Sequence, residues 1–319
     1  MENKVNLRTS LTILGLFALL GLGAWIYQLA NGLVVTGMRN VVSWGLYITS
    51  FMFFVGLSAG GLIVSSSATV FNIPAFKVVA KPAVILSTVC IILAGMFIVV
   101  DLGSPQRILY LLIHPQFQSP LIWDVIVITV YLVVSLLYLH HMTQPAPDQR
   151  KLATLSTVAL PAAVLVHSVT AWIFGLQIAR ISWHSALMAP LFVASALDSG
   201  LALLIIVLAL LERVSDYKVD AKLYASLGGL LAVFVAVDAF FVFSEILTAA
   251  YPGEETVMAA LRLLTTGPLA PFFWVQVVLG LIVPFVILAN AGNRQIKSRI
   301  LLASALVVIG VFCKRAWLL

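Results

Sequence analysis

The chain has 319 residues, of which 62% are hydrophobic and only 9% are charged. With a mean hydropathy of +1.12, this composition excludes a soluble globular domain. The formal net charge is +6, but nearly all Lys and Arg residues lie in short gaps between long apolar runs. We therefore interpret the charge as a signal of topology in a lipid membrane, and we expect no nucleic-acid partner.

Nine apolar runs are each long enough to cross a hydrocarbon core of about 30 Å as a helix. In chain order they lie at residues 10–30, 41–70, 80–101, 120–142, 153–178, 185–211, 222–250, 269–291 and 299–317. The first run is too long for a signal peptide, so we expect it to be retained. The sequence predicts an all-α polytopic transmembrane protein. It has an N-terminal helix and loop at residues 1–40 and two four-helix bundles at 41–180 and 181–319.

The positive charges predict the orientation of these spans. The side that holds the N-terminus carries twelve basic residues: Lys4, Arg8, Lys77, Lys81, Arg150, Lys151, Arg213, Lys218, Lys222, Arg294, Lys297 and Arg299. The opposite side carries six: Arg39, Arg107, Arg180, Arg262, Lys314 and Arg315. The positive-inside rule then predicts a cytoplasmic N-terminus and an outer C-terminus in a bacterial or archaeal cytoplasmic membrane.

The second and sixth runs resemble each other, which indicates an internal repeat. The second begins near Trp44 and reaches Gly60 and Gly61, and the sixth begins near Trp183 and reaches Gly200. Both run from the outside inward, so the repeat is parallel. Small residues at these positions favour a close approach of neighbouring helix backbones.

Six ionisable residues lie inside or at the edge of the apolar runs. A charge near the middle of a bilayer costs several kcal/mol, so such residues are functional candidates. They are Asp101, Asp124, His167, Asp198, Asp238 and Glu245.

The depths of three of these residues follow from the helix rise. His167 is expected about 15 Å below the outer membrane surface, Asp198 about 20 Å and Asp238 about 18 Å. Glu245 lies seven residues after Asp238, so both face the same way. We expect these three acids either to form a proton path or to be buried structural partners.

A histidine inside the membrane, below a face that carries acids, Trp and Tyr, is typical of a quinone site. We expect His167 to bond a ring carbonyl and accept a proton. The alternative for His167 is a bond between helices to a backbone carbonyl or hydroxyl. Tyr47 and Asp101 are the next candidates for hydrogen bonding and proton release. Trp44 and Arg107 are expected to shape the rim of the site or a docking surface.

Two other functions are less consistent with the pattern. Haem needs histidines that face each other from helix interiors, and only His167 lies well inside a run. An iron–sulfur cluster needs four ligands, whereas the chain has two cysteines, Cys90 and Cys313. We expect no metal site. A stand-alone proton- or ion-coupled transporter could use Asp198 and Asp238, although transporter repeats are often inverted.

Three ordered motifs carry a resemblance to a known family. They are WGLYITSFMFFVGLSAGG at residues 44–61, DLGSPQR at 101–107 followed by SPLIWD at 119–124, and WHSALMAPLFVASALDSG at 183–200. Together they resemble the NrfD family, the membrane subunits of polysulfide reductase and related respiratory complexes. The resemblance covers about residues 40–317.

The resemblance implies two four-helix bundles that hold no haem or iron–sulfur cluster. It also implies electron exchange between menaquinol or menaquinone and a ferredoxin-like 4Fe–4S subunit docked at the outer face. That subunit would in turn serve a molybdopterin catalytic subunit. The implied quinone site lies in the first bundle near the outer face. In this chain it would be bounded by Trp44, Tyr47, Thr49, Met52, Asp101, Ser104, Arg107 and His167.

Overall fold

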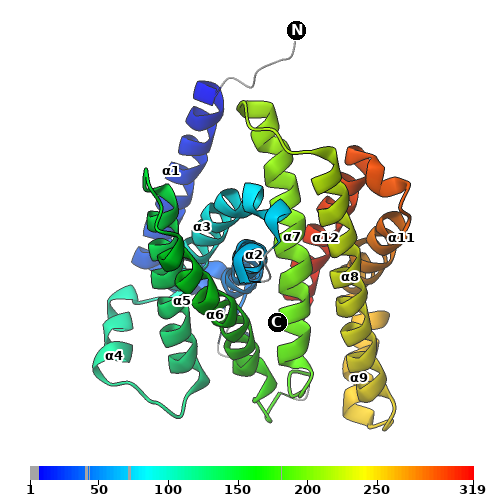
Figure 1. Cartoon of the computed structure of the whole chain (residues 1–319). Coiled ribbons are helices and arrows are strands. Elements are labelled where there is room, and N and C mark those ends of the chain that lie inside the picture. Colours follow the sequence, from blue (N-terminus) through cyan, green and yellow to red (C-terminus); the bar gives the residue numbers. More distant parts are fainter. Residues whose placement is uncertain (1–6, 40–41, 43, 71–72, 181) are drawn as a thin grey trace.

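The structure, a computed structural model, describes residues 7–39, 42, 44–70, 73–180 and 182–319. Every regular element in these ranges is helical, and nine segments are long and apolar enough to cross a membrane. The predicted all-α polytopic fold is therefore confirmed for this part of the chain (Figure 1). The predicted start of the second run at Val41, and the domain boundaries at 40/41 and 180/181, involve residues outside the described ranges.

Eight of the spans contain one long α-helix each. These helices are α1 (Leu7–Asn31), α2 (Leu46–Val70), α3 (Lys77–Asp101), α5 (Pro120–Thr143), α6 (Gln149–Gly175), α7 (Met188–Val214), α8 (Ala221–Ala250) and α12 (Lys297–Leu318). The remaining span is composite and consists of α10 (Ala270–Trp274), a π-helical segment (Val275–Ile282) and α11 (Val283–Ala289). Two shorter helices, α4 (Ile108–Ile113) and α9 (Glu255–Thr265), lie in connections between spans.

The helical form of these segments follows from their surroundings. In hydrocarbon each backbone N–H and C=O group must be satisfied within the segment, which a helix achieves. Side chains in the polar gaps fix two of the helix starts. Asp148 accepts hydrogen bonds from the backbone N–H groups of Arg150 and Lys151 at the start of α6, and Asp220 accepts one from Lys222 at the start of α8.

The centre of the molecule is formed by α2 and α7. Their most apolar windows are 83% and 72% buried, more than those of the other spans. In sequence order, α3, α5 and α6 follow α2, and α8, α11 and α12 follow α7; contacts link the helices within each group. Figure 1 looks nearly along α2, whereas α7 and α8 run lengthwise, so the two central helices cross steeply.

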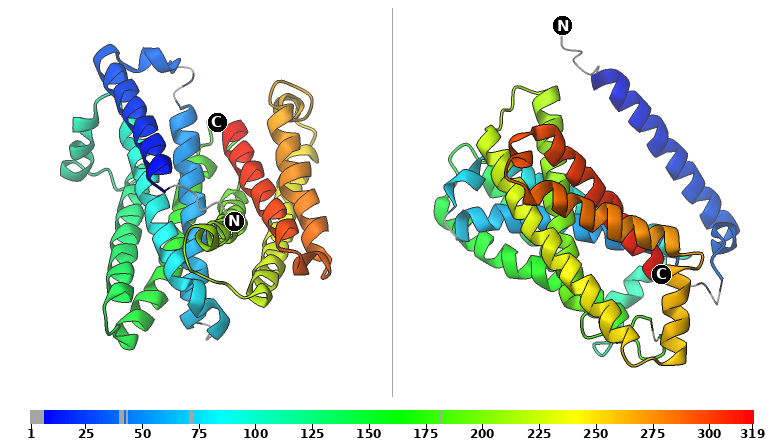
Figure 2. Two further views of the ribbon diagram at one scale, coloured as in Figure 1. Left: turned by 90° about the horizontal axis from the view of Figure 1, so that it is seen from above. Right: turned by 90° about the vertical axis from the view of Figure 1, so that its right-hand side faces the viewer.

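The N-terminal helix α1 differs from the rest. None of its most apolar window is buried, and the right-hand view of Figure 2 shows it running beside the other helices, set apart from them. Its anchor lies near its C-terminal end, where the Gln28 amide donates a 2.8 Å hydrogen bond to the Val100 carbonyl of α3. In a membrane, lipid would cover the remaining surface of α1.

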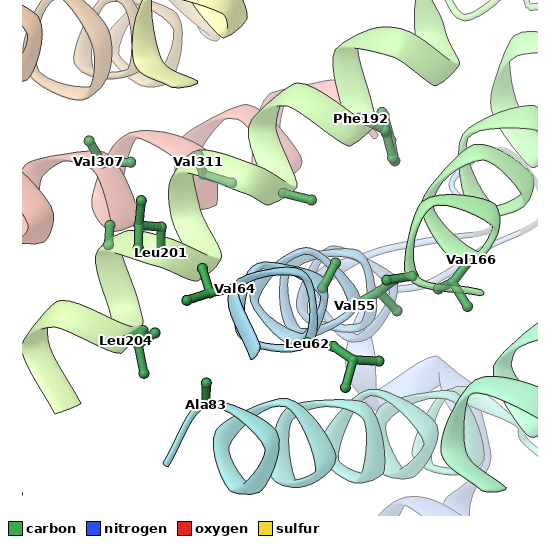
Figure 3. Packing of buried hydrophobic residues seen from close by; sticks show 14 of the residues in the cluster. Val55, Leu62, Val64, Ala83, Val166, Phe192, Leu201, Leu204, Val307 and Val311 are labelled. Atoms are coloured by element: carbon green, nitrogen blue, oxygen red, sulfur yellow. The ribbon is translucent and has the colours of Figure 1, made fainter. Parts of the chain in front are cut away.

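A glycine pair lets α2 and α7 meet backbone to backbone. A Cβ atom added at Gly60 would lie 2.4 Å from the Cα of Gly200, and one at Gly200 would lie 2.5 Å from the Cα of Gly60. In the internal repeat Gly200 corresponds to Gly61, the neighbour of Gly60 in sequence. The close approach predicted for these small residues is therefore confirmed, with Gly60 at the contact. Around this crossing, apolar side chains of α2, α7 and α12 form the core, including Val64, Leu201 and Val307 (Figure 3).

One inference from the charge pattern is wrong. Lys314 and Arg315 do not lie in the outer loops, because both are inside α12 with exposed fractions of 2% and 0%. Both long side chains lie in the protein interior near the buried acids Asp198 and Asp238. With these two removed, the outer side keeps four of its six basic residues, so the asymmetry that predicts a cytoplasmic N-terminus becomes larger.

Candidate functional site

An aromatic cluster joins the two halves of the molecule at the helix ends that the sequence predicts to face outward. The rings of Trp44 and Trp183 stack with centroids 5.7 Å apart, and Phe174 packs edge-on against both. The Trp183 indole also donates a 2.7 Å hydrogen bond to the Leu318 carbonyl at the end of α12. Trp44 and its counterpart in the repeat, Trp183, therefore pack the two halves of the molecule against each other.

A polar cluster lies next to this aromatic cluster, where α1, α2 and α3 meet. The Tyr47 hydroxyl donates a 2.7 Å hydrogen bond to the Gln28 side chain, whose amide reaches the Val100 carbonyl. Asp101 follows Val100 at the end of α3 and is half-buried. Its Oδ1 atom is buried and has no hydrogen-bond partner among the described residues. Gln28 thus links Tyr47 to Val100, the residue that precedes Asp101.

Three further predicted site residues flank this cluster. Ser104 precedes the 3₁₀ turn Pro105–Arg107, and its carbonyl accepts a 2.9 Å hydrogen bond from the Arg107 backbone N–H. The Arg107 side chain is exposed. Thr49 is 4% exposed and lies in the interior next to Met52 in the packing of α2.

His167 lies deeper and is enclosed by backbone. Its Nδ1 atom is 2.8 Å from the Ala163 carbonyl of its own helix, and its Nε2 atom is 2.9 Å from the Val55 carbonyl of α2. The side chain is 2% exposed. Because Val55 lies eight residues after Tyr47, His167 sits about 12 Å further into the membrane than the Tyr47 cluster. The structure does not bring His167 together with Tyr47 or Asp101.

The remaining ionisable candidate of the first half, Asp124, has a specific partner. It is 5% exposed on α5 and accepts a 2.6 Å hydrogen bond from the Thr170 hydroxyl of α6. The bond ties α5 to α6 three residues from His167 in sequence, and it gives Asp124 a structural role.

The second half contains a buried cluster of charged side chains, which we call the charge cluster: Asp198, Asp238, Lys314 and Arg315. The Lys314 ammonium lies 3.5 Å from an Asp238 oxygen, and both side chains are almost fully buried. Arg315 donates a 2.7 Å hydrogen bond to the Ser195 hydroxyl and lies over the ring of Phe192 at 3.8 Å. Two acids and two bases balance in charge, which lowers the cost of burying them.

The charge cluster retains unused hydrogen-bonding capacity. Both Asp198 oxygens, the Asp238 Oδ2 atom and two Arg315 nitrogens have no hydrogen-bond partner among the described residues. Asp198 lies within electrostatic range of Asp238, Lys314 and Arg315. Glu245 is half-buried seven residues after Asp238 and also lies within electrostatic range of the cluster. The structure therefore brings the three predicted acids together.

Arg315 also connects the charge cluster to the first half. A Cβ atom at Gly56 of α2 would lie 3.8 Å from an Arg315 nitrogen, so the guanidinium reaches the α2 backbone. The preceding carbonyl, that of Val55, is the one that faces His167. His167 and Arg315 thus approach α2 at adjacent residues.

Sequence reasoning missed Lys314, Arg315 and Gln28. The first two had a usable signal, because buried acids on neighbouring helices require compensating charges and the last apolar run contains both bases. Gln28 lies in an exposed helix, and nothing in its sequence context identifies Val100 or Tyr47 as partners. Among the described residues, no group of three or more His, Cys, Asp or Glu side chains is placed to hold a metal ion.

Comparison with known proteins agrees with this architecture. The family model described as "Polysulphide reductase, NrfD" matches residues 34–319. A Halobacterium salinarum protein, which is named as a membrane subunit of a dimethyl sulfoxide reductase, is 39% identical, covering 94% of this chain and 74% of the relative.

Two more distant relatives carry related names. The Hdr-like menaquinol oxidoreductase integral membrane subunit of Archaeoglobus fulgidus is 30% identical, covering 95% of this chain and 77% of the relative. A protein of Wolinella succinogenes that is named as part of polysulfide reductase is 26% identical, covering 88% of this chain and 94% of the relative. The chain therefore belongs to the NrfD polysulphide reductase family, as a multi-pass membrane subunit of a respiratory oxidoreductase.

Proposed function

We propose that this subunit exchanges electrons between menaquinol or menaquinone and a ferredoxin-like 4Fe–4S subunit docked at its outer face. That partner would pass electrons to or from a molybdopterin catalytic subunit, and the chain itself would hold neither haem nor an iron–sulfur cluster. The observation that carries the proposal is the family match over residues 34–319, together with a relative named as a menaquinol oxidoreductase subunit. The N-terminus would be cytoplasmic and the C-terminus outside.

The quinone would bind at the outer end of the first four-helix unit, residues 41–180. The Tyr47 hydroxyl oxygen can accept a hydrogen bond from a quinol hydroxyl, and it can donate one to a quinone carbonyl by giving up its bond to Gln28. Asp101 offers a buried carboxylate oxygen that can accept a proton. The walls and rim would be formed by Trp44, Thr49, Ser104 and Arg107. His167 stays a prediction: its Nε2 atom can bond a quinone only by giving up its contact with the Val55 carbonyl.

Variants at the outer cluster test this location. Asp101→Asn is expected to slow menaquinol-analogue oxidation by the purified complex about 100-fold, because an amide cannot accept the released proton. Tyr47→Phe is expected to slow it about tenfold through the loss of one hydrogen bond to the ring. Tyr110→Phe is the matched control, because Tyr110 is exposed on the same side and its ring stacks on that of His114.

The same assay decides the role of His167. If His167→Ala abolishes quinol oxidation while the subunits stay associated, the quinone ring reaches the depth of His167. Full activity in His167→Ala together with loss in Asp101→Asn would place the ring at the outer cluster and make His167 structural. Full activity in Asp101→Asn, Tyr47→Phe and His167→Ala would refute a site in the first four-helix unit and move the search to Glu245.

The charge cluster supports proton movement as part of the function. Quinol oxidation releases two protons, and buried polar atoms without protein partners are normally bonded to ordered water, which can conduct protons. We propose that Asp198, Asp238 and Glu245 form a path between the centre of the membrane and an aqueous side. Arg315 would couple this path to the His167 region across α2.

Asp198→Asn is the cleanest test of that path, because Asp238→Asn would also break the ion pair with Lys314. In vesicles, Asp198→Asn is expected to keep quinol oxidation within about threefold but to lower the number of protons moved per quinol. An internal pH dye measures the ratio, with Asp216→Asn in an exposed loop as control. An unchanged proton ratio in Asp198→Asn would remove Asp198 from the proposed path.

A stand-alone proton- or ion-coupled transporter remains the second candidate, favoured by the buried acids alone. The two functions differ in partnership. A quinone subunit should co-purify with an iron–sulfur protein after mild solubilisation, whereas a transporter should purify without one. Transport by the isolated chain, without any redox partner, would favour the second candidate.

A further inference from the structure

A groove on the lipid-facing surface between α8 and α11 lies outside the proposed quinone site. Its volume is about 430 Å³, and it is lined mainly by apolar side chains, among them Ala236, Phe240 and Phe285. The two helices pack side by side, and they face the viewer in the right-hand view of Figure 2. A groove open to the membrane and walled by alanine and phenylalanine suits a hydrocarbon chain.

One end of the groove carries a positive charge. Arg294, in the turn between α11 and α12, belongs to the groove lining. Among the described residues, its guanidinium has no hydrogen-bond acceptor and no acidic partner within salt-bridge distance. Gly229 of α8 makes room for it, because a Cβ atom there would lie 2.6 Å from an Arg294 nitrogen. The donors of Arg294 are therefore available at the mouth of an apolar groove.

The length of the groove matches one leaflet of a membrane. From Gly229 to Phe241 the lining runs twelve residues along α8, which corresponds to about 18 Å. Half of a hydrocarbon core of about 30 Å is about 15 Å. A ligand that lies along the groove would thus have its polar group at the membrane surface near Arg294 and its chain directed toward the midplane.

The charge at this surface selects the polar group. Lys222 and Arg299 are exposed at the same ends of α8 and α12, whereas Lys297 is neutralised by Glu212. Basic residues near a membrane surface attract anionic lipids, and a guanidinium binds phosphate through two parallel hydrogen bonds. The groove combines both features, an apolar channel one leaflet long and, among the described residues, an unpaired arginine at its end.

We propose that this groove is a binding site for an anionic phospholipid of the leaflet on the N-terminal side. One acyl chain lies between α8 and α11, and Arg294 binds the phosphate. The lipid fills the seam beside α11 and holds this part of the composite span against α8.

Spin-labelled lipids test the proposal on the purified complex in phosphatidylcholine vesicles. Phosphatidylglycerol and phosphatidylcholine with the same labelled chain are compared by the motionally restricted fraction of the label. The wild type is expected to prefer phosphatidylglycerol about fivefold, and Arg294→Gln is expected to abolish that preference. Lys222→Gln removes one charge at the same surface but outside the groove lining, and this variant should keep the preference for phosphatidylglycerol. Ala236→Trp, which fills the groove, should reduce the restricted fraction of both lipids.

Three results would overturn the site. Equal binding of both lipids to the wild type would show that the site does not select an anionic phospholipid, because both lipids carry a phosphate. A preference that survives in Arg294→Gln but is lost in Lys222→Gln would assign the attraction to the general surface charge. A restricted fraction that Ala236→Trp leaves unchanged would show that the acyl chain lies elsewhere.

Discussion

Lys314→Met is expected to lower the free energy of unfolding by about 3–5 kcal/mol, the largest single effect that we predict. Lys314 is 2% exposed, and its ammonium faces the fully buried Asp238 at 3.5 Å. Removing the base leaves Asp238 as an uncompensated charge, with one oxygen that already has no partner among the described residues. Most of the lost stability comes from leaving the Asp238 charge buried without its partner, because the net contribution of an ion pair to stability is much smaller.

A double-mutant cycle separates these contributions. Asp238→Asn combined with Lys314→Met removes both charges and is expected to recover most of the loss seen in Lys314→Met alone. The matched control is Lys297→Met, which breaks the surface pair with Glu212 and should cost at most about 1 kcal/mol. Unfolding in mixed detergent micelles compares the wild type, the two single variants of the cycle, the double variant and Lys297→Met. If Lys314→Met is no less stable than Lys297→Met, Lys314 does not compensate a buried charge.

Gly60→Ala is expected to destabilise the protein by about 3 kcal/mol or more, at the upper end of overpacking effects. The new Cβ atom would lie 2.4 Å from the Cα of Gly200, and backbone cannot move aside as a flexible side chain can. Either α2 and α7 separate or both helices bend, and each response opens the core around Leu201 and Val64.

The control for this substitution is Gly95→Ala on α3, where an added Cβ atom meets nothing within 4 Å. Gly95→Ala should be neutral or slightly stabilising, by up to about 1 kcal/mol, because alanine favours the helix. The same unfolding assay compares the two variants. Equal stability of Gly60→Ala and Gly95→Ala would contradict the close crossing of α2 and α7.

Much of the fold could be predicted because hydrocarbon leaves few choices. Length and apolarity alone define the nine spans, and the internal repeat predicted that Gly60 would permit a close approach. Side chains whose hydrogen-bond partners are backbone atoms were harder to predict from the sequence. His167 faces the carbonyls of Ala163 and Val55, and a carbonyl at a given depth leaves no mark in the sequence.

Charge rules explain the main error in the site. Lys314 and Arg315 stand near the end of the last span, where the positive-inside rule treats basic residues as loop charges. Their burial depends on the acids of α7 and α8, which lie far away in sequence and become neighbours only when α12 packs against both helices. Depth along single helices could not pair the acids with bases.

The most direct test of the proposed function is electron transfer from a menaquinol analogue to the iron–sulfur clusters of the co-purified partner, followed by electron paramagnetic resonance. The complex that contains this chain is expected to reduce those clusters, and the complex prepared without it should not. Chemical reduction by dithionite should still work in both preparations, which shows that the clusters are intact. Cluster reduction by the quinol analogue at the same rate without this chain would contradict its role as the quinone-reactive subunit.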